Sequence, residues 1–319
     1  MTNVPGMQNG NDNTFLILGT LLTLLGLLLY VGFTMKSGQV VPVGNAGYFG
    51  IVTSSVNWCE LDYDITYYIA EFWNTLSSLA MVFVGGIGVC LHYGVLEKRF
   101  LLAFFFVAVL GVGSCLFHAT LKHEGQMADE LPMLYAAMTT AYILIENEKK
   151  SKYRVLVPVF VGWAIVTSGL TFFSEGLMQF ILFHLSFSSA EFFSLYRVYV
   201  VYSTRTGGSR SNDAEKAMVR NLFMRGFFSY VLGMFVWYID LSNCDFVQGY
   251  WPEVSGLPNP QLHAWWHVLV SSGFLHLIVL IAYDRQLTLK TKPSVTFLWS
   301  CIPYVHVENM ILIDDRIKL

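Results

Sequence analysis

The sequence predicts an all-α, polytopic membrane protein: a bundle of seven transmembrane helices with an additional hydrophobic span near the amino terminus. Three observations lead to this fold class. Only 13% of the 319 residues are charged, compared with about 25% in an average soluble domain. Another 55% are hydrophobic, and they gather in stretches about as long as a membrane helix. The segments between these stretches also differ in charge, as the two sides of a membrane require.

Residues 1–36 are expected to form a disordered polar start followed by the additional span. Residues 1–13 are polar and rich in Asn and Gly, as disordered termini often are. Residues 14–35 contain no charged side chain and are long enough to cross a bilayer. The first basic residue is Lys36, so the positive region that opens a secretory signal is missing. A retained span is therefore favoured over a cleaved signal.

The segment 66–290 is expected to be the seven-helix domain, and it follows a linker, 37–65, that carries an acidic segment. Its apolar stretches lie near 67–91, 100–121, 131–146, 154–173, 177–202, 222–241 and 264–283. Basic loops alternate with loops poor in Lys and Arg, so the positive-inside rule places the basic loops and the tail 291–319 in the cytosol. The linker 37–65 then faces the lumen or the exterior. No basic run of the kind that binds nucleic acid is present.

The last apolar stretch opens with two histidines, His263 and His267, at helical spacing. Residues at i and i+4 share one helix face, and two neutral imidazoles so placed are typical zinc ligands. The alternative interpretation is an interfacial patch of His and Trp. His118 ends the second stretch on the same side of the membrane, and Asp129 begins the third there. The polar candidates therefore converge on one leaflet.

This combination predicts a zinc hydrolase. Three histidine ligands leave a fourth position open for water, as in catalytic zinc sites, and zinc lowers the pKa of that water while Asp129 takes its proton. Ser114 lies one helical turn before His118 and would donate to the oxyanion, although helix serines often bond their own backbone instead. The predicted reaction is hydrolysis of an amide or ester reached from the membrane. A transporter is disfavoured because the polar groups do not trace a path across.

These motifs resemble the signature of the CREST superfamily of membrane hydrolases, and within it the chain is similar to the alkaline ceramidases over residues 47–300. The matching runs are 57–60, 68–77, 96–99, 129–133 and 263–267. The resemblance implies a seven-helix fold that cleaves ceramide, its lipid substrate, into sphingosine and a fatty acid. It implies zinc ligation by His118, His263 and His267, activation of water by Asp129, and stabilisation of the oxyanion by Ser114.

The resemblance also implies a calcium site at the start of the first core helix. Its matched positions provide hard oxygen ligands of the kind that Ca²⁺ prefers: Asn57, the Trp58 carbonyl, Glu60, Asp62 and Glu71. Asn57 and Asp62 are exchanged relative to the family pattern, which conserves the ligand charge and predicts an altered geometry. The resemblance further pairs Cys59 with Cys244 in a disulfide, which fits their expected position on the oxidising side of the membrane.

Two other functions remain open on the sequence alone. One is a seven-helix receptor of the adiponectin or progestin type, which shares the zinc ligands, and the other is a hydrolase acting on a different lipid amide or ester. The acidic segment and the run 263–267 favour the ceramidase. We expect residence in the endoplasmic reticulum or the Golgi with the active site towards the lumen. Asp240 is interpreted either as a carboxylate that orients a ligand histidine, which is favoured, or as a residue at the helix boundary. Acyl-chain preference and oligomeric state are left open.

Overall fold

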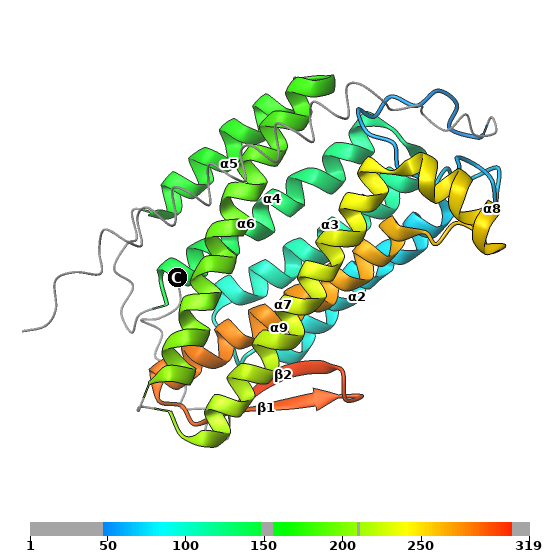
Figure 1. Cartoon of the computed structure of the whole chain (residues 1–319). Coiled ribbons are helices and arrows are strands. Elements are labelled where there is room, and N and C mark those ends of the chain that lie inside the picture. The colour runs from blue at the N-terminus through cyan, green and yellow to red at the C-terminus, as the bar shows by residue number, and fades with distance from the viewer. Residues whose placement is uncertain (1–46, 148–155, 209–210, 308–319) are drawn as a thin grey trace, which may run out of the picture.

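The computed structural model describes residues 47–147, 156–208 and 211–307. In this part of the chain, long helices lie side by side and form a bundle (Figure 1): α2 (Phe72–His92), α3 (Lys98–Thr120), α4 (His123–Ile145), α5 (Leu156–Phe172), α6 (Gly176–Gly207), α7 (Asp213–Ser242) and α9 (Leu262–Leu289). Four of them, α2, α3, α7 and α9, are long and apolar enough to cross a membrane. The additional span predicted over residues 14–35 lies outside the described residues.

Several helix boundaries differ from the prediction, each for a local reason. Helix α2 begins at Phe72 rather than near residue 67, because Ala70 instead donates its backbone N–H to Ala119 at the end of α3, at 3.0 Å. Helix α4 begins at His123 rather than near residue 131, so Asp129 lies inside the helix and not at its start. Helix α7 begins at Asp213 rather than near residue 222, because Asn212 caps it.

Glycines allow α3 to approach both of its neighbours closely. A Cβ atom at Gly113 would lie 1.8 Å from the backbone oxygen of Ala128 in α4, and a Cβ at Gly85 of α2 would lie 2.3 Å from the backbone nitrogen of Ala108 in α3. Only glycine fits at such contacts, as is common where membrane helices pack. The close contact between α3 and α4 brings Ser114 next to Asp129.

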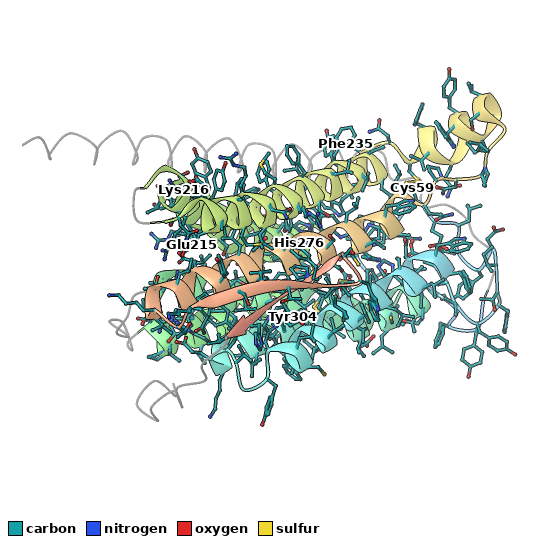
Figure 2. The ribbon with its side chains drawn as sticks, turned by 90° about the horizontal axis from the view of Figure 1, so that it is seen from below. Cys59, Glu215, Lys216, Phe235, His276 and Tyr304 are labelled. Carbon is teal, nitrogen blue, oxygen red and sulfur yellow. A yellow bond between two sulfur atoms is a disulfide. The ribbon has the colours of Figure 1, made fainter. Side chains whose placement is uncertain are left out.

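The described part of the chain is mostly helical, as predicted, and its tail adds two strands that the sequence did not predict. Strands β1 (Pro293–Leu298) and β2 (Ile302–Val307) form an antiparallel hairpin, with Trp299 and Ser300 at positive φ in the turn, as tight hairpins require. The hairpin lies across α2 and α9 (Figure 2). His92 at the end of α2 accepts a hydrogen bond from the backbone N–H of Val305, at 3.2 Å. The tail is therefore packed on the helical domain as far as residue 307.

The two ends of the bundle have different characters. At one end, the loop 47–71 lies beside the short helices η1 (Phe246–Tyr250) and α8 (Trp251–Ser255), which connect α7 to α9 (Figure 1). At the other end, ion pairs join neighbouring helices: Arg285 contacts Glu97 at 2.6 Å, and Arg205 contacts Asp284 at 2.5 Å. Figure 2 shows Cys59 at the first end and Glu215 at the second. The sequence-predicted site residues gather at the first end.

Candidate metal centre

Three histidines from two helices meet inside the bundle. His118 comes from the last turn of α3, and His263 and His267 come from the first turns of α9, where their spacing places both on one face. One nitrogen from each ring lies within 4.8 Å of the others, and all three side chains are buried. Within the described ranges, this is the cluster of three or more His, Cys, Asp or Glu residues that is compact enough for a metal ion.

Two ring nitrogens of this cluster suggest that it is built for a ligand. His118 Nε2 and His263 Nδ1 are buried and have no hydrogen-bond partner among the described residues. A buried polar atom without a partner costs about 1–3 kcal/mol, and a metal ion between the rings would satisfy both atoms. Neutral imidazole nitrogens suit Zn²⁺ and several other transition metals. The residues present therefore fit a metal, and the chemistry of the donors alone does not name it.

Neighbouring groups fix how the three rings are turned. The Glu71 carboxylate contacts Nδ1 of His118, the Ser77 hydroxyl lies 2.8 Å from Nδ1 of His267, and the Trp58 ring stacks on His263 with centroids 3.8 Å apart. Partners of this kind orient metal-ligating histidines and select the tautomer. Ser77 was not singled out from the sequence, because a serine in an apolar helix carries no signal until its neighbour is known.

Asp240 contacts the main chain at the start of α9. Its carboxylate accepts the backbone N–H of His263 and the backbone N–H of Cys59, the latter at 3.2 Å. It therefore holds the start of α9 and the preceding loop together, and it positions His263 through the main chain rather than through the imidazole ring.

Asp129 and Ser114 face each other between α4 and α3. The Ser114 hydroxyl bonds to the Asp129 carboxylate, and it accepts a hydrogen bond from the Ser78 hydroxyl at 3.0 Å. The hydroxyl of Ser114 is therefore used between helices rather than on its own backbone. Both residues line the same cavity as His263 and His267. The structure thus brings together Asp129, Ser114 and the histidines that the sequence singled out.

Glu130, the residue after Asp129, belongs to a polar network that the sequence did not predict. The Glu130 carboxylate accepts hydrogen bonds from Gln126, at 2.7 Å, and from Gln179 of α6. Gln126 in turn accepts the backbone N–H of Ser55 at 2.8 Å. The network joins α4, α6 and the loop before α2 at the level of Asp129, and it fixes that turn of α4 in place.

A cavity of about 360 Å³ extends from the candidate metal centre into the bundle. Asp129, Ser114, His263 and His267 line its polar end. The rest is mainly apolar and is formed largely by α4, α6, α7 and α9, with contributions from α2 and α3, as far as Ile281. Ile281 lies 14 residues beyond His267, about 21 Å along the helix axis. The cavity is therefore long, apolar over most of its length and suited to hydrocarbon chains.

The predicted calcium ligands lie together, but most of them already have partners. Both Glu60 oxygens accept backbone N–H groups at the start of α2, from Trp73 at 2.6 Å and Asn74 at 2.9 Å. Asp62 accepts a hydrogen bond from the Asn57 amide at 3.2 Å. Within the part of the chain that is described, these carboxylates do not form a compact three-ligand cluster of the kind the histidines form.

Burial leaves this acidic group short of compensating charge. Burial raises the pKa of Glu60 to about 7, of Asp62 to about 6 and of Glu71 to about 8, and the negative charge of Glu71 adds to the effect on the other two. Carboxylates so placed are stabilised by a nearby cation. The electrostatics of the loop thus favour a bound cation without identifying it.

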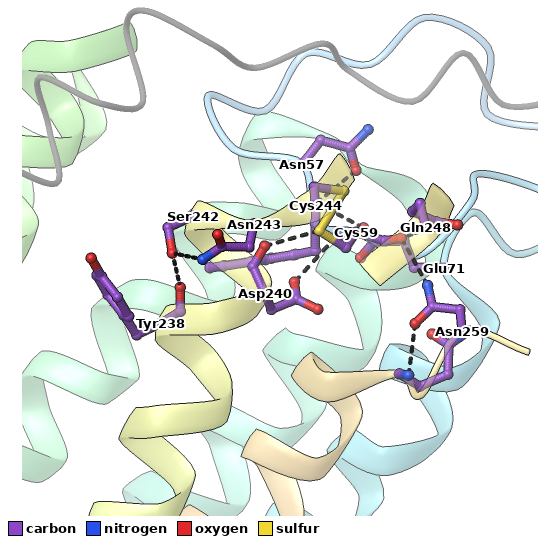
Figure 3. Close-up of a disulfide and its surroundings, with 12 residues drawn as sticks. Asn57, Cys59, Glu71, Tyr238, Asp240, Ser242, Asn243, Cys244, Gln248 and Asn259 are labelled. Atoms are coloured by element: carbon purple, nitrogen blue, oxygen red, sulfur yellow. Dashed lines mark hydrogen bonds between the residues drawn. A yellow bond between two sulfur atoms is a disulfide. The ribbon is translucent and has the colours of Figure 1, made fainter. Parts of the chain in front are cut away.

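A disulfide joins two segments at this end of the bundle. Cys59 is bonded to Cys244, with Cα atoms 5.3 Å apart, and Asp240 lies beside the bond (Figure 3). The Cys59 carbonyl also accepts a hydrogen bond from Asn259, at 3.1 Å, and another from Gln248. The loop that carries the acidic group is thus connected covalently to the segment that follows α7.

Apolar helices, a buried three-histidine cluster that could hold a metal ion and a long apolar cavity together define the class of the protein, an integral membrane protein. A family model described as Ceramidase matches residues 50–306, and the chain belongs to the ceramidase family. It is 33% identical to alkaline ceramidase 3 of Mus musculus, over 83% of this chain and 97% of the relative. It is 30% identical to an alkaline ceramidase of Saccharomyces cerevisiae, over 79% and 83%. It is 29% identical to the alkaline ceramidase of Arabidopsis thaliana, over 83% and 97%.

Proposed function

We propose that the protein is a zinc-dependent intramembrane amidohydrolase that cleaves ceramide into sphingosine and a free fatty acid. Family membership and the names of the relatives support the reaction and the substrate. The observation that carries the mechanism is the cluster of three buried histidines, two of which, His263 and His267, line the polar end of one long cavity together with Asp129 and Ser114. His118, His263 and His267 would hold the zinc ion.

Each residue of the centre has a distinct role in this proposal. When bound, zinc supplies Lewis acidity that activates water and polarises the amide carbonyl. Asp129 accepts the proton of the attacking water and passes it to the nitrogen of the leaving amine. The water oxygen bonds to the acyl carbon, the C–N bond breaks, and the amine leaves with the proton. Ser114 donates its hydroxyl to the carbonyl oxygen as negative charge develops there.

The cavity accounts for how a lipid substrate would bind. Its apolar length accommodates hydrocarbon chains, while its polar end places the amide against His263 and His267. We propose that α2 to α7 and α9 all span the membrane, that residues 14–35 add a further span, and that the histidine end faces the lumen of the endoplasmic reticulum or the Golgi. The basic residues at the opposite end, including Lys98, Arg99 and Arg285, support this orientation.

We also propose a calcium ion at the acidic group. Glu60, Asp62 and Glu71 would supply carboxylate oxygens, with the Asn57 side chain and the Trp58 carbonyl completing the set. The raised pKa values of the three carboxyl groups support this proposal, because an added cation would offset the cost of their burial.

The proposed function is tested by incubating purified protein in detergent with a panel of ceramides and quantifying both sphingosine and bound zinc. Wild type should release sphingosine and carry one zinc ion per chain, and His267→Ala should lose both. His306→Ala is the matched control, because this histidine is exposed on β2, outside the cluster. Zinc without ceramide cleavage would favour a receptor or another lipid substrate. An active wild type without zinc would refute the mechanism.

A further inference from the structure

A pair of polar side chains lies in the apolar part of the cavity, away from the candidate metal centre. Glu191 of α6 and Tyr230 of α7 both line the cavity, and their side chains are hydrogen-bonded to each other. We propose that this pair recognises a hydroxyl group carried part-way along one hydrocarbon chain of the lipid substrate. The inference rests on the proposed function and adds a determinant of substrate choice to it.

The packing of α7 on α9 gives the depth of the pair. A Cβ atom at Gly273 would lie 3.0 Å from Cβ of Tyr230, so these residues are at the same level in the antiparallel helices. Gly273 is six residues beyond His267, which corresponds to about 9 Å along the axis. The Tyr230 ring also lies beside Trp266, with centroids 6.4 Å apart. A substrate whose amide is at the histidines would therefore pass Glu191 and Tyr230 several methylene groups along a chain.

Glu191 has hydrogen-bonding capacity that the protein does not use. A carboxyl group in apolar surroundings within a membrane is costly and is usually paired or functional. None of the ion pairs formed by the described residues involves Glu191, and Tyr230 is the partner that the structure gives it. The two carboxyl oxygens provide about four acceptor positions, and a tyrosine hydroxyl fills one of them. A hydroxyl from a ligand would fill another.

Three of the other hydroxyl groups on the cavity wall differ from this pair. Thr140, Ser194 and Ser271 each donate to a carbonyl of their own helix four residues earlier, at 2.9, 2.8 and 2.6 Å. Their hydrogen-bonding needs are therefore met within the helix, and they present mainly apolar surface to the cavity. Glu191 and Tyr230 instead bond each other across two helices, and both remain able to bond a third group.

The expected selectivity follows from the cost of unsatisfied polar atoms. An unsubstituted chain packed against the pair would exclude water from it and offer no hydrogen bond in return, whereas a chain hydroxyl at this depth would donate to a carboxylate oxygen of Glu191, which Tyr230 holds in place. Sites built to bind a substrate hydroxyl discriminate strongly against the analogue that lacks it. If the pair only linked α6 to α7, its removal would change the cleavage of all ceramides by the same factor.

The experiment compares ceramides of equal chain length that carry a single hydroxyl at successive positions. One series places it on the acyl chain and a second on the sphingoid chain, so that the two chains are distinguished. Each substituted ceramide competes with the unsubstituted one in the same reaction with purified full-length protein, which gives the ratio of their kcat/KM values. The proteins are wild type, Tyr230→Phe, Glu191→Gln and Glu191→Leu. Ser229→Ala is the control, because this hydroxyl bonds Leu269 and does not line the cavity.

Wild type should prefer one hydroxyl position in one series by about tenfold or more, the factor expected for a hydrogen bond to a carboxylate. Tyr230→Phe and Glu191→Leu should remove that preference, Glu191→Gln should retain part of it, and Ser229→Ala should leave it unchanged. A flat profile in wild type, or a preference that survives in Tyr230→Phe and Glu191→Leu, would overturn the inference. If unsubstituted and substituted ceramides all resist cleavage by wild type, the proposed function itself fails.

Discussion

At the scale of single residues, Glu71 connects the two proposed metal sites. Its side chain is buried, one oxygen contacts His118, and the other accepts the backbone N–H of Trp58 at 3.1 Å. The sequence suggested that Glu71 is important, because a carboxylate in an apolar helix is costly, but it assigned the residue to calcium alone. The contact with His118 depends on how the loop 47–71 folds back on α3, which spacing along the chain does not reveal.

Replacing Glu71 with Gln should weaken zinc binding and lower ceramide hydrolysis by roughly 10–100-fold, the usual effect of losing a carboxylate behind a ligand histidine. An amide accepts the N–H of His118 less strongly and no longer selects one tautomer. Zinc affinity should be measured by chelator competition, both with saturating calcium and with calcium removed, so that the two sites are separated. Glu253→Gln, on the exposed surface of α8, is the control. Unchanged zinc affinity in both conditions would contradict the role assigned to Glu71.

At the scale of the elements, the contact between α3 and α4 decides whether Ser114 and Asp129, the proposed catalytic pair, come together. Ser114 follows Gly113 directly, and the backbone of Ala128, next to Asp129, passes where a side chain at Gly113 would be. From the sequence, the i and i+4 spacings predicted which residues share a helix face. The sequence did not reveal which helices touch, and the early start of α4 moved Asp129 from a helix end to a helix interior.

Gly113→Ala should therefore lower activity at least tenfold and reduce thermal stability. The added methyl group would push α4 away from α3, because the atom it meets is a backbone oxygen that cannot rotate aside. Activity and the melting temperature should both be measured in detergent. Gly86→Ala is the matched control, since a Cβ at Gly86 meets nothing within 4 Å. Equal behaviour of the two variants would show that the close contact is not needed for the site.

At the scale of the whole molecule, the sequence predicted the apolar helices and the histidine centre well, because periodicity and spacing encode both. It predicted the tail less well: the hairpin 293–307 depends on pairing with itself and on packing against α2 and α9, which are tertiary properties. Ser77, Glu130 and Glu191 were also missed, because a polar residue in an apolar helix shows its role only when its partner is known. Residues 14–35, predicted to span the membrane, lie outside the described residues.

Thermal stability of the whole protein should depend on calcium in a pH-dependent way. Burial raises the pKa of Glu60 from 4.5 to about 7, of Asp62 from 3.8 to about 6 and of Glu71 from 4.5 to about 8. Without a cation, their contribution to folding stability is therefore present below the ordinary values and is lost as the pH rises through the higher ones. A cation favours the ionised carboxylates and should reverse this loss.

We expect the increase in melting temperature on adding calcium to be small at about pH 5 and clearly larger at about pH 9. Melting should be followed in calcium and in chelator at both pH values. Asp64→Asn is the control, because this carboxylate lies in the same loop but is exposed, and it should preserve the pH dependence. A calcium effect of equal size at the two pH values would argue against binding by Glu60, Asp62 and Glu71.

The disulfide has a topological consequence for the centre as a whole. The bond between Cys59 and Cys244 closes a covalent ring that contains α2 to α7, including His118, while α9 with His263 and His267 lies outside that ring. A single peptide cut between residues 60 and 243 would leave both pieces joined, and only reduction would separate them. One of the three histidines therefore lies inside the ring and two lie outside it. A metal ion bound by all three would connect α9 to the ring a second time, in addition to the peptide chain that follows Cys244.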